Sequence, residues 1–334
     1  MISQSGSKWN RVGSRSALAV SAAFAASLSA VGAPAPAAVV NGASDVVAAS
    51  QSAMQQGFAS PDQAGEALAA AWRSGHSAEL LKIFGPAGLP LVRSGDSVAD
   101  HHARQRLAAA YGLSHRIDLE AGGKAVLIIG QEAWPYPIPL IKQGDIWRFD
   151  VNAGARQIID RRIGRNEMRV ITTAREYVNA QRDYAARTAA NGGRREYAQR
   201  IASTQGERDG LYWPASNSED ESPLGPQVAA AEARGYPPPG DTDRQPFEGY
   251  VFRVLTAQGP HAPGGDRSYL ADGHMTKGFA LVAFPAKYGD SGIMTFIVNQ
   301  DGIVWERNLG PDTSPIARAI DAYDPGPGWT IAEP

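Results

Sequence analysis

One stretch of helical periodicity, residues 155–190, is longer than any other in this chain and limits the folds it can adopt. Apolar side chains recur along it at the spacing of a single helix face. They are Ile163, Val170, Ala174, Tyr177 and Tyr184. Asn152 precedes the stretch, and asparagine is typical of a residue that caps a first helical turn. A helix of this length can bridge two folded units, so we expect one on each side of it.

The segment before this helix predicts helices followed by strands. Ser60, Pro61 and Gln63 form the pattern of an N-cap, a first-turn proline and a capping box. We expect further helices at 77–84 and 98–111, then strands at 115–120, 125–130, 138–141 and 146–151. Helices followed by an antiparallel sheet make an α+β unit, here residues 58–152. Its element order is similar to that of nuclear-transport-factor-2-like domains, a resemblance that implies their fold.

The last third of the chain has the clearest strand pattern. Strands are predicted at 249–258, 278–286, 293–300 and 303–307. Asp301-Gly302 separates the last two and is a strong hairpin signal. Because residues 279–284 are apolar on both faces, their strand should be central and covered by a helix. The long helix is the natural cover.

The segments around this sheet complete the predicted architecture. Residues 195–202 are expected to be helical and to complete a bridging segment, 153–202. The polar span 203–247 is predicted to be an irregular loop of the C-terminal β domain, 203–330, and a short helix at 312–323 closes the chain. The fold class is therefore predicted to be α+β.

The first 38 residues have the pattern of a secretory signal peptide. Basic residues come first, then an apolar run at 17–31 that is too short for a membrane span, then small residues with cleavage sites near Ala35 or Ala38. A flexible leader, 39–57, would follow. We therefore expect a periplasmic or secreted protein.

Composition narrows the classes of partner. The chain has no cysteine, which excludes disulfides and thiolate chemistry. Removing the signal peptide removes three basic residues and no acidic ones, so the formal net charge changes from −2 to −5. Nucleic acid is not an expected partner of such a chain. No membrane span is predicted in the mature chain, and no motif calls for a cofactor.

Long strings of the sequence resemble a family of secreted bacterial proteins of unknown function, the one numbered 2950. The strings are GRNEMRVITTAREYVNAQRDYA, ERDGLYWPASNSEDESPLGP, GYVFRVLTAQGPHAPGGDRSY and KGFALVAFPAKYGDSGIMTFIVNQDGIVWERNLGPDT. The resemblance runs over about residues 58–330. It implies an exported bacterial protein and assigns no activity.

The C-terminal half is also similar to the globular heads of type II secretion pseudopilins. The shared order is a long helix, an irregular loop, GYVFRV, GFALVAFPA and the Asp301-Gly302 hairpin. The helix here is internal and amphipathic, and no prepilin cleavage motif precedes it. The resemblance therefore implies a pilin-like fold without polymerisation.

Two groups of residues are candidates for binding. Arg161, Arg165 and Arg169 form a stripe on the long helix that could grip an anionic envelope polymer or an acidic protein, or could simply face water. The second group lies in the irregular loop: Arg208, Asp209, Tyr212 and Trp213. Large aromatic residues in a loop either stack on a ligand or fix the loop to the sheet.

Ser291 is the candidate nucleophile, because residues 289–292 read GDSG as they do around the nucleophile of trypsin-like proteases. A serine needs a base within hydrogen-bond reach, and His274 is the candidate. A plain hairpin turn explains the same four residues.

Metal chemistry has weaker signals. His101 and His102 are adjacent and would point about 100° apart on a helix, which does not suit one ion. Asp241 and Asp243 resemble the start of a calcium loop but lack its later ligands. The sequence therefore predicts an exported, non-enzymatic protein that binds a protein partner or an envelope polymer. The alternative is a periplasmic hydrolase that uses Ser291 or loop carboxylates.

Overall fold

A computed structural model describes residues 55–190, 192–215, 220–240 and 245–333. All of them belong to one compact unit, Ser44–Pro334. The predicted signal peptide, its cleavage sites at Ala35 and Ala38, and the calcium-like pair Asp241 and Asp243 lie outside the described residues.

The N-terminal part begins with helices, as predicted. They are α2 (Pro61–Ser74), α3 (Ser77–Phe84), the 3₁₀ turn η1 (Pro86–Gly88), α4 (Leu89–Val92) and α5 (Ser97–Leu113). The predicted start of α2 is confirmed, because the Ser60 side chain accepts a hydrogen bond from the Gln63 N–H at 3.2 Å. Asp96 caps α5 in the same way, accepting from the Ala99 N–H at 2.9 Å.

An antiparallel sheet follows these helices. Its strands are β1 (His115–Glu120), β2 (Lys124–Ile129), β3 (Trp134–Pro135), β4 (Leu140–Gln143) and β5 (Ile146–Phe149), in the order β1-β2-β4-β5 with β3 also on β2. Buried side chains of α2 and α3 pack with those of the sheet. Phe84 meets Phe149 edge to face, with ring centroids 5.7 Å apart.

The structure confirms the predicted long helix as α6 (Val151–Ala190), and its role as a bridge between two units stays a prediction. Asn152 does not cap it, because the helix begins one residue earlier and the Asp150 side chain accepts from the Ala153 N–H at 3.2 Å. The prediction for Asn152 was therefore wrong. Asp150, the residue directly after β5, caps α6 instead.

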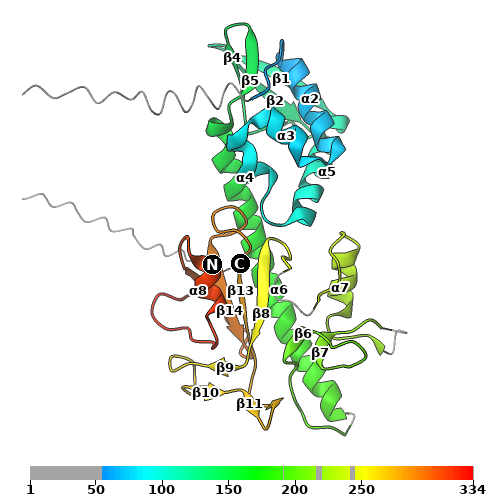
Figure 1. The fold of residues 1–334 in the computed structure, drawn as a ribbon, viewed down its shortest axis with the longest axis vertical. Coiled ribbons are helices and arrows are strands. Elements are labelled where there is room, and N and C mark those ends of the chain that lie inside the picture. Colours follow the sequence, from blue (N-terminus) through cyan, green and yellow to red (C-terminus); the bar gives the residue numbers. More distant parts are fainter. Residues whose placement is uncertain (1–54, 191, 216–219, 241–244, 334) are drawn as a thin grey trace, which may run out of the picture. The chain divides into compact units, whose positions relative to one another are not determined.

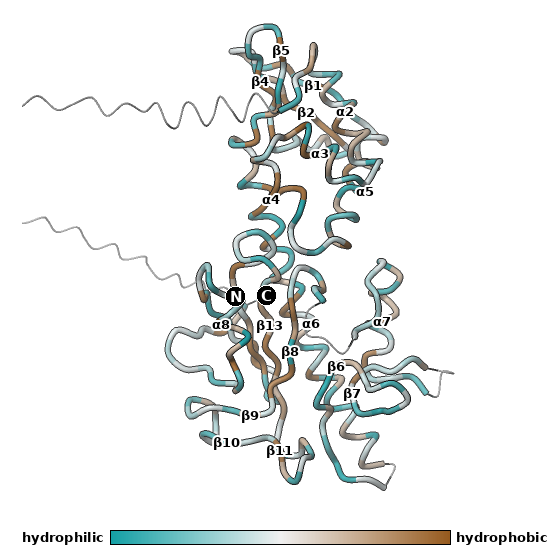
Figure 2. The backbone as a smooth tube through the Cα atoms, viewed as in Figure 1, coloured by the Kyte–Doolittle hydropathy of each residue, from teal (hydrophilic) through white to brown (hydrophobic). Residues whose placement is uncertain are grey.

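The C-terminal sheet is antiparallel and has five strands. They are β8 (Tyr250–Leu255), β13 (Ala280–Pro285), β14 (Met294–Asn299), β15 (Val304–Asn308) and β16 (Thr330–Ile331), in the order β16-β15-β14-β13-β8. Every residue of β13 is buried, and Figure 2 shows hydrophobic residues along β8 and β13. The predicted hairpin at Asp301-Gly302 joins β14 to β15.

The predicted cover of this sheet is confirmed. Helix α6 runs along it and contacts β13, β14 and β15 (Figure 1). The Tyr177 hydroxyl donates to the Ala280 carbonyl at 3.0 Å. The short helix α8 (Thr313–Arg318) contacts β13. It ends well before residue 323, because Tyr323 instead donates its N–H to the Ala257 carbonyl at 2.9 Å.

Two local predictions were wrong in the middle of the chain. Residues 195–202 are not helical, since β6 (Arg200–Ala202) pairs in parallel with β7 (Gly210–Tyr212). The buried Gln181 side chain bonds both the N–H and the carbonyl of Ala198, at 2.9 and 2.7 Å, and so holds this segment extended. The span 203–247 also contains a helix, α7 (Gly225–Glu232).

Four short strands complete the described elements. They are β9 (Ala257–Gln258), paired with β10 (Arg267–Ser268), and β11 (Leu270–Ala271), paired with β12 (His274–Met275). Helices with antiparallel sheets confirm the α+β class. The nuclear-transport-factor-2-like fold, the pilin-like fold and the domain boundaries 58–152, 153–202 and 203–330 stay predictions.

Candidate functional site

A pocket of about 960 Å³ lies among α6, α7, β6 and β8. One face of α6 lines it with residues at helical spacing, namely Arg169, Thr172, Thr173, Glu176 and Tyr177. Apolar side chains from the other elements, including Ile201, Val228 and Phe252, complete the wall. A cavity of this size, mainly apolar and with a few polar groups, is typical of ligand sites.

Glu248 is a buried residue of the pocket wall. It lies in a two-residue turn in which Phe247 and Tyr250 exchange both backbone hydrogen bonds, at 2.8 and 3.0 Å. Glu248 and Gly249 have φ of 52° and 82°, the values of a type I′ turn. Glutamate has no preference for this left-handed conformation, so the turn holds Glu248 under strain.

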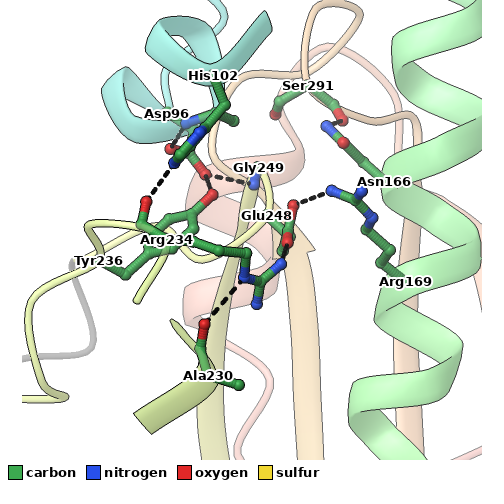
Figure 3. Close-up of polar contacts among 11 residues, drawn as sticks. Asp96, His102, Asn166, Arg169, Ala230, Arg234, Tyr236, Glu248, Gly249 and Ser291 are labelled. Carbon is green, nitrogen blue, oxygen red and sulfur yellow. Dashed lines mark hydrogen bonds and ion pairs between the residues drawn. The ribbon is translucent and has the colours of Figure 1, made fainter. Parts of the chain in front are cut away.

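The Glu248 carboxylate joins two arginines across the pocket wall (Figure 3). One oxygen pairs with Arg169 of α6 and the other with Arg234, which follows α7. The Glu248 side chain is 6% exposed, whereas those of Arg169 and Arg234 are 50% and 44% exposed. Two guanidinium groups on one carboxylate leave a local charge of +1, with N–H donors still open to solvent.

Aromatic rings position Arg234. Its guanidinium lies 5.8 Å from the ring centroid of Tyr236 and 5.5 Å from that of Phe247. Its Nε donates to the Ala230 carbonyl at 3.2 Å. Glu176 is the second acidic group of the pocket, and burial raises its pKa while Arg234 opposes that rise. The pocket therefore presents the guanidinium groups of Arg169 and Arg234, with the carboxylate of Glu176, beside apolar surface.

Asp96 anchors this turn from the N-terminal part of the chain. Its carboxylate accepts from the Gly249 N–H at 2.8 Å and from the Tyr236 hydroxyl at 2.9 Å (Figure 3). Burial, followed by the negative charge of Asp96, raises the pKa of Tyr236. Gly249 is required here, because a Cβ would lie 2.4 Å from the Asn166 side-chain nitrogen. The conformation of the turn is thus set by α5 and α6 together.

A family model described as "Protein of unknown function (DUF2950)" matches residues 55–331. This chain belongs to the DUF2950 family. The match includes every residue named above for the pocket. No match to the chain was found among curated proteins or among solved structures. Among the helices that the structure describes in this DUF2950 protein, none is long and apolar enough to cross a membrane.

The predicted arginine stripe of the DUF2950 chain divides into different environments. Only Arg169 lines the pocket. Arg161 lies over the Trp134 ring, 5.6 Å from its centroid. Partial burial, and then the positive charges of Arg106, Arg169, Arg162 and Arg161, lower the pKa of Arg165. A binding role for Arg161 and Arg165 stays a prediction.

The loop residues predicted to bind do not line this pocket. Trp213 is 9% exposed, belongs to the C-terminal core and donates from Nε1 to the Asp220 carbonyl at 2.8 Å. Arg208 stacks on the Trp213 ring at 5.5 Å and pairs with Asp220. Asp209 accepts from the N–H and hydroxyl of Thr204, at 2.7 and 2.8 Å. Tyr212 ends β7. These contacts favour a role in fixing the loop, and ligand binding by this group stays a prediction.

Ser291 and His274 occupy separate places. The Ser291 side chain is fully buried, and its hydroxyl accepts from the Lys287 N–H at 2.9 Å and donates to the Lys287 carbonyl at 3.1 Å. His274 is bonded through Nδ1 to Glu196 at 2.5 Å. Within the described part of the chain no hydrogen bond joins the two residues. Their catalytic role stays a prediction.

Sequence reasoning missed the residues that build the pocket's charged wall. Glu248, Arg234 and Asp96 come from three separate segments, and no short motif contains more than one of them. The one usable signal was Gly249, the first residue of the predicted strand 249–258, because glycine at the end of a strand is typical of a tight turn. Within the described residues no group of three or more histidines and carboxylates is arranged to hold a metal ion.

Proposed function

We propose that this DUF2950 protein is an exported, non-enzymatic binding protein whose ligand occupies the pocket between α6, α7 and β8. The observation that carries the proposal is the pair of half-exposed guanidinium groups held by buried Glu248 beside an apolar cavity. Guanidinium groups bind carboxylate, sulfonate and phosphate oxygens through several N–H donors. The expected ligand therefore combines an anionic group with apolar surface.

The chemistry of the wall supports binding over catalysis. Arginine stays protonated at all ordinary pH values, so Arg169 and Arg234 are suited to hold an anion and not to transfer a proton. Glu248 is occupied by both arginines. Export is supported by the predicted signal peptide.

Binding can be tested with 8-anilinonaphthalene-1-sulfonate, a dye with a sulfonate on an apolar body. We expect saturable binding by the wild-type protein and roughly tenfold weaker binding after Arg169→Gln with Arg234→Gln, since charge-assisted hydrogen bonds are lost. The matched control carries Arg116→Gln with Arg156→Gln, two arginines whose side chains are 56% and 79% exposed and do not line the pocket. Circular dichroism checks that each variant is folded.

Equal dye affinity in the two double variants would contradict a pocket ligand held by Arg169 and Arg234. Export has a separate test. N-terminal sequencing of the protein recovered from the native host should give a chain that begins after Ala35 or Ala38. An intact N-terminus on cytosolic material would contradict export.

A further inference from the structure

Helix α6 presents a stripe of exposed side chains to solvent. The positions of the stripe follow one another at steps of four, three, four and three residues, which is the spacing of a helix face that packs on another helix. At 1.5 Å per residue the stripe is about 21 Å long. Its five side chains are those of Arg161, Arg165, Met168, Thr172 and Arg175.

The three arginines of the stripe form no ion pair with any residue that the structure describes. The acidic residues of α6 are engaged elsewhere. Asp160 and Asp183 form i,i+4 pairs with other arginines of the helix. Glu167 accepts a hydrogen bond from the Ile293 N–H at 2.9 Å, and Glu176 lines the pocket. The positive charge of the stripe is therefore not compensated within its own helix.

Arg165 is surrounded by other positive charges. Partial desolvation, and then the charges of four neighbouring arginines, lower the pKa of Arg165. These neighbours are Arg106 of α5 and Arg169, Arg162 and Arg161 of α6. Like charges at such spacing on a helix are destabilising. An anionic partner would relieve this repulsion, which favours binding of negative charge.

Two side chains make the stripe more than a row of charges. The guanidinium of Arg161 lies over the ring of Trp134, 5.6 Å from its centroid, and this contact orients it. Met168 is 62% exposed, and within the described residues it is the one large apolar side chain of α6 that is exposed. Arginine and methionine are both enriched where proteins bind one another. The stripe therefore has the composition of a protein-binding surface.

We propose that this stripe binds an acidic helix of a partner protein. Side chains of a helix lying along α6 recur at the same intervals, so its carboxylates meet the three arginines while an apolar side chain covers Met168. Thr172 also lines the pocket and is not needed for these contacts. Arg161, Arg165, Met168 and Arg175 do not line the pocket, so the surface is separate from the pocket of the proposed function.

Geometry and charge argue against other occupants. A second copy of this chain would bring the same arginines against one another. A single phosphate or carboxylate is too small to reach both ends of a stripe about 21 Å long. An extended peptide repeats its same-face side chains about every 6.6 to 6.8 Å, whereas the stripe repeats on average about every 5.3 Å. An anionic polysaccharide would neutralise the arginines but gives Met168 no apolar contact.

The probe is a synthetic helical peptide of about 21 residues, close to six turns, in which glutamates recur at the spacing of the stripe with one leucine among them. A scrambled peptide of identical composition keeps the charge and loses the face. A third peptide carries lysine in place of glutamate. Polyglutamate and alginate supply anionic chains without a helical face. The full-length secreted protein is titrated with each probe at low ionic strength.

We expect the glutamate peptide to bind about tenfold more tightly than its scrambled form, because several charge-assisted contacts depend on the spacing. The lysine peptide should not bind. The stripe variant, Arg161→Gln with Arg165→Gln and Arg175→Gln, should bind the glutamate peptide at least about tenfold more weakly. Met168→Ala should weaken binding by about fivefold, since the apolar contact is lost.

The matched control removes the same charge from other exposed positions. It carries Arg194→Gln, Arg195→Gln and Arg267→Gln, which lie outside both the stripe and the pocket. This variant should change peptide affinity by less than about twofold, because charges beyond about 10 Å are screened at 0.1 M salt. The stripe variant should bind 8-anilinonaphthalene-1-sulfonate like the wild type, which shows that the pocket is intact.

Equal affinity for the glutamate peptide and its scrambled form would overturn the proposal of a helical partner. Tighter binding of alginate or polyglutamate than of the glutamate peptide would do the same, and so would the absence of peptide binding at millimolar concentration. An equal loss of affinity in the stripe variant and the matched control would show that only net charge matters. If the stripe variant fails to fold, Met168→Ala and the scrambled peptide still decide the question.

Discussion

Removing the charge of Glu248 tests whether its ion pairs with Arg169 and Arg234 stabilise the fold. We consider Glu248→Gln, which keeps the shape and the strained turn but leaves Arg169 and Arg234 without a counter-ion. Two unit charges about 4 Å apart attract by about 4 kcal/mol at an effective dielectric constant of 20. Half exposure of both guanidinium groups reduces this to about 2 kcal/mol for each pair.

The expected net loss is smaller than the two pairs together. Burying the Glu248 carboxylate costs several kcal/mol, which the neutral amide avoids in part. We therefore expect Glu248→Gln to lower the free energy of unfolding by about 2 kcal/mol. The coupling energy between Glu248 and Arg169 in a double-mutant cycle should be about 1 to 2 kcal/mol.

Urea unfolding followed by circular dichroism measures each corner of the cycle. The control is the exposed pair Arg156 and Asp160 on the same helix, 2.9 Å apart, with side chains 79% and 52% exposed. Pairs of this kind contribute about 0.3 to 0.5 kcal/mol. A Glu248–Arg169 coupling no larger than that of the control would refute the reasoning.

Three further predictions concern the turn, its anchor Asp96 and the nearby Asp100 of α5. Gly249→Ala should lower the free energy of unfolding by more than about 2 kcal/mol, because it combines a left-handed φ with a Cβ 2.4 Å from a neighbouring side chain. The control is Gly289→Ala, at a glycine with φ of 77° and no atom within 4 Å of the added Cβ. In urea unfolding this control should lower the free energy of unfolding by only about 1 to 2 kcal/mol. Tyr236→Phe removes the donor to Asp96 at 2.9 Å and should lower the free energy of unfolding by about 1.5 to 3 kcal/mol, and an unchanged urea midpoint would exclude that bond. Burial raises the pKa of Asp100 above its ordinary 3.8, opposed by hydrogen bonds from Ser94 and by nearby arginines. The folded state then binds the proton more tightly than the unfolded state. The free energy of unfolding of the wild-type protein should therefore fall, relative to that of Asp100→Asn, as the pH rises from just above 3.8. A stability difference between the two proteins that does not change with pH would contradict this.

Local rules were sufficient for much of the fold. The start of α2 follows from Ser60 and Gln63, whose contact spans three residues. The hairpin between β14 and β15 follows from Asp301-Gly302, and α6 follows from its periodic apolar face. In each case the stabilising contacts lie within a few residues, so the sequence pattern contains them.

Elements held by distant residues were predicted poorly. Residues 195–202 adopt an extended conformation because Gln181, seventeen residues away from Ala198, takes their backbone hydrogen bonds. Helix propensity in that segment is only a weak preference, and buried side-chain bonds override it.

The amino-acid sequence alone determined the α+β class, the long helix and the main strands, because these depend on local periodicity and turn chemistry. Only the tertiary structure decided where a ligand could bind. Glu248 meets Arg169 across 79 residues of sequence, and Asp96 holds Gly249 across 153. Pairings over such distances depend on how helices and sheets pack, which no short pattern in the chain encodes.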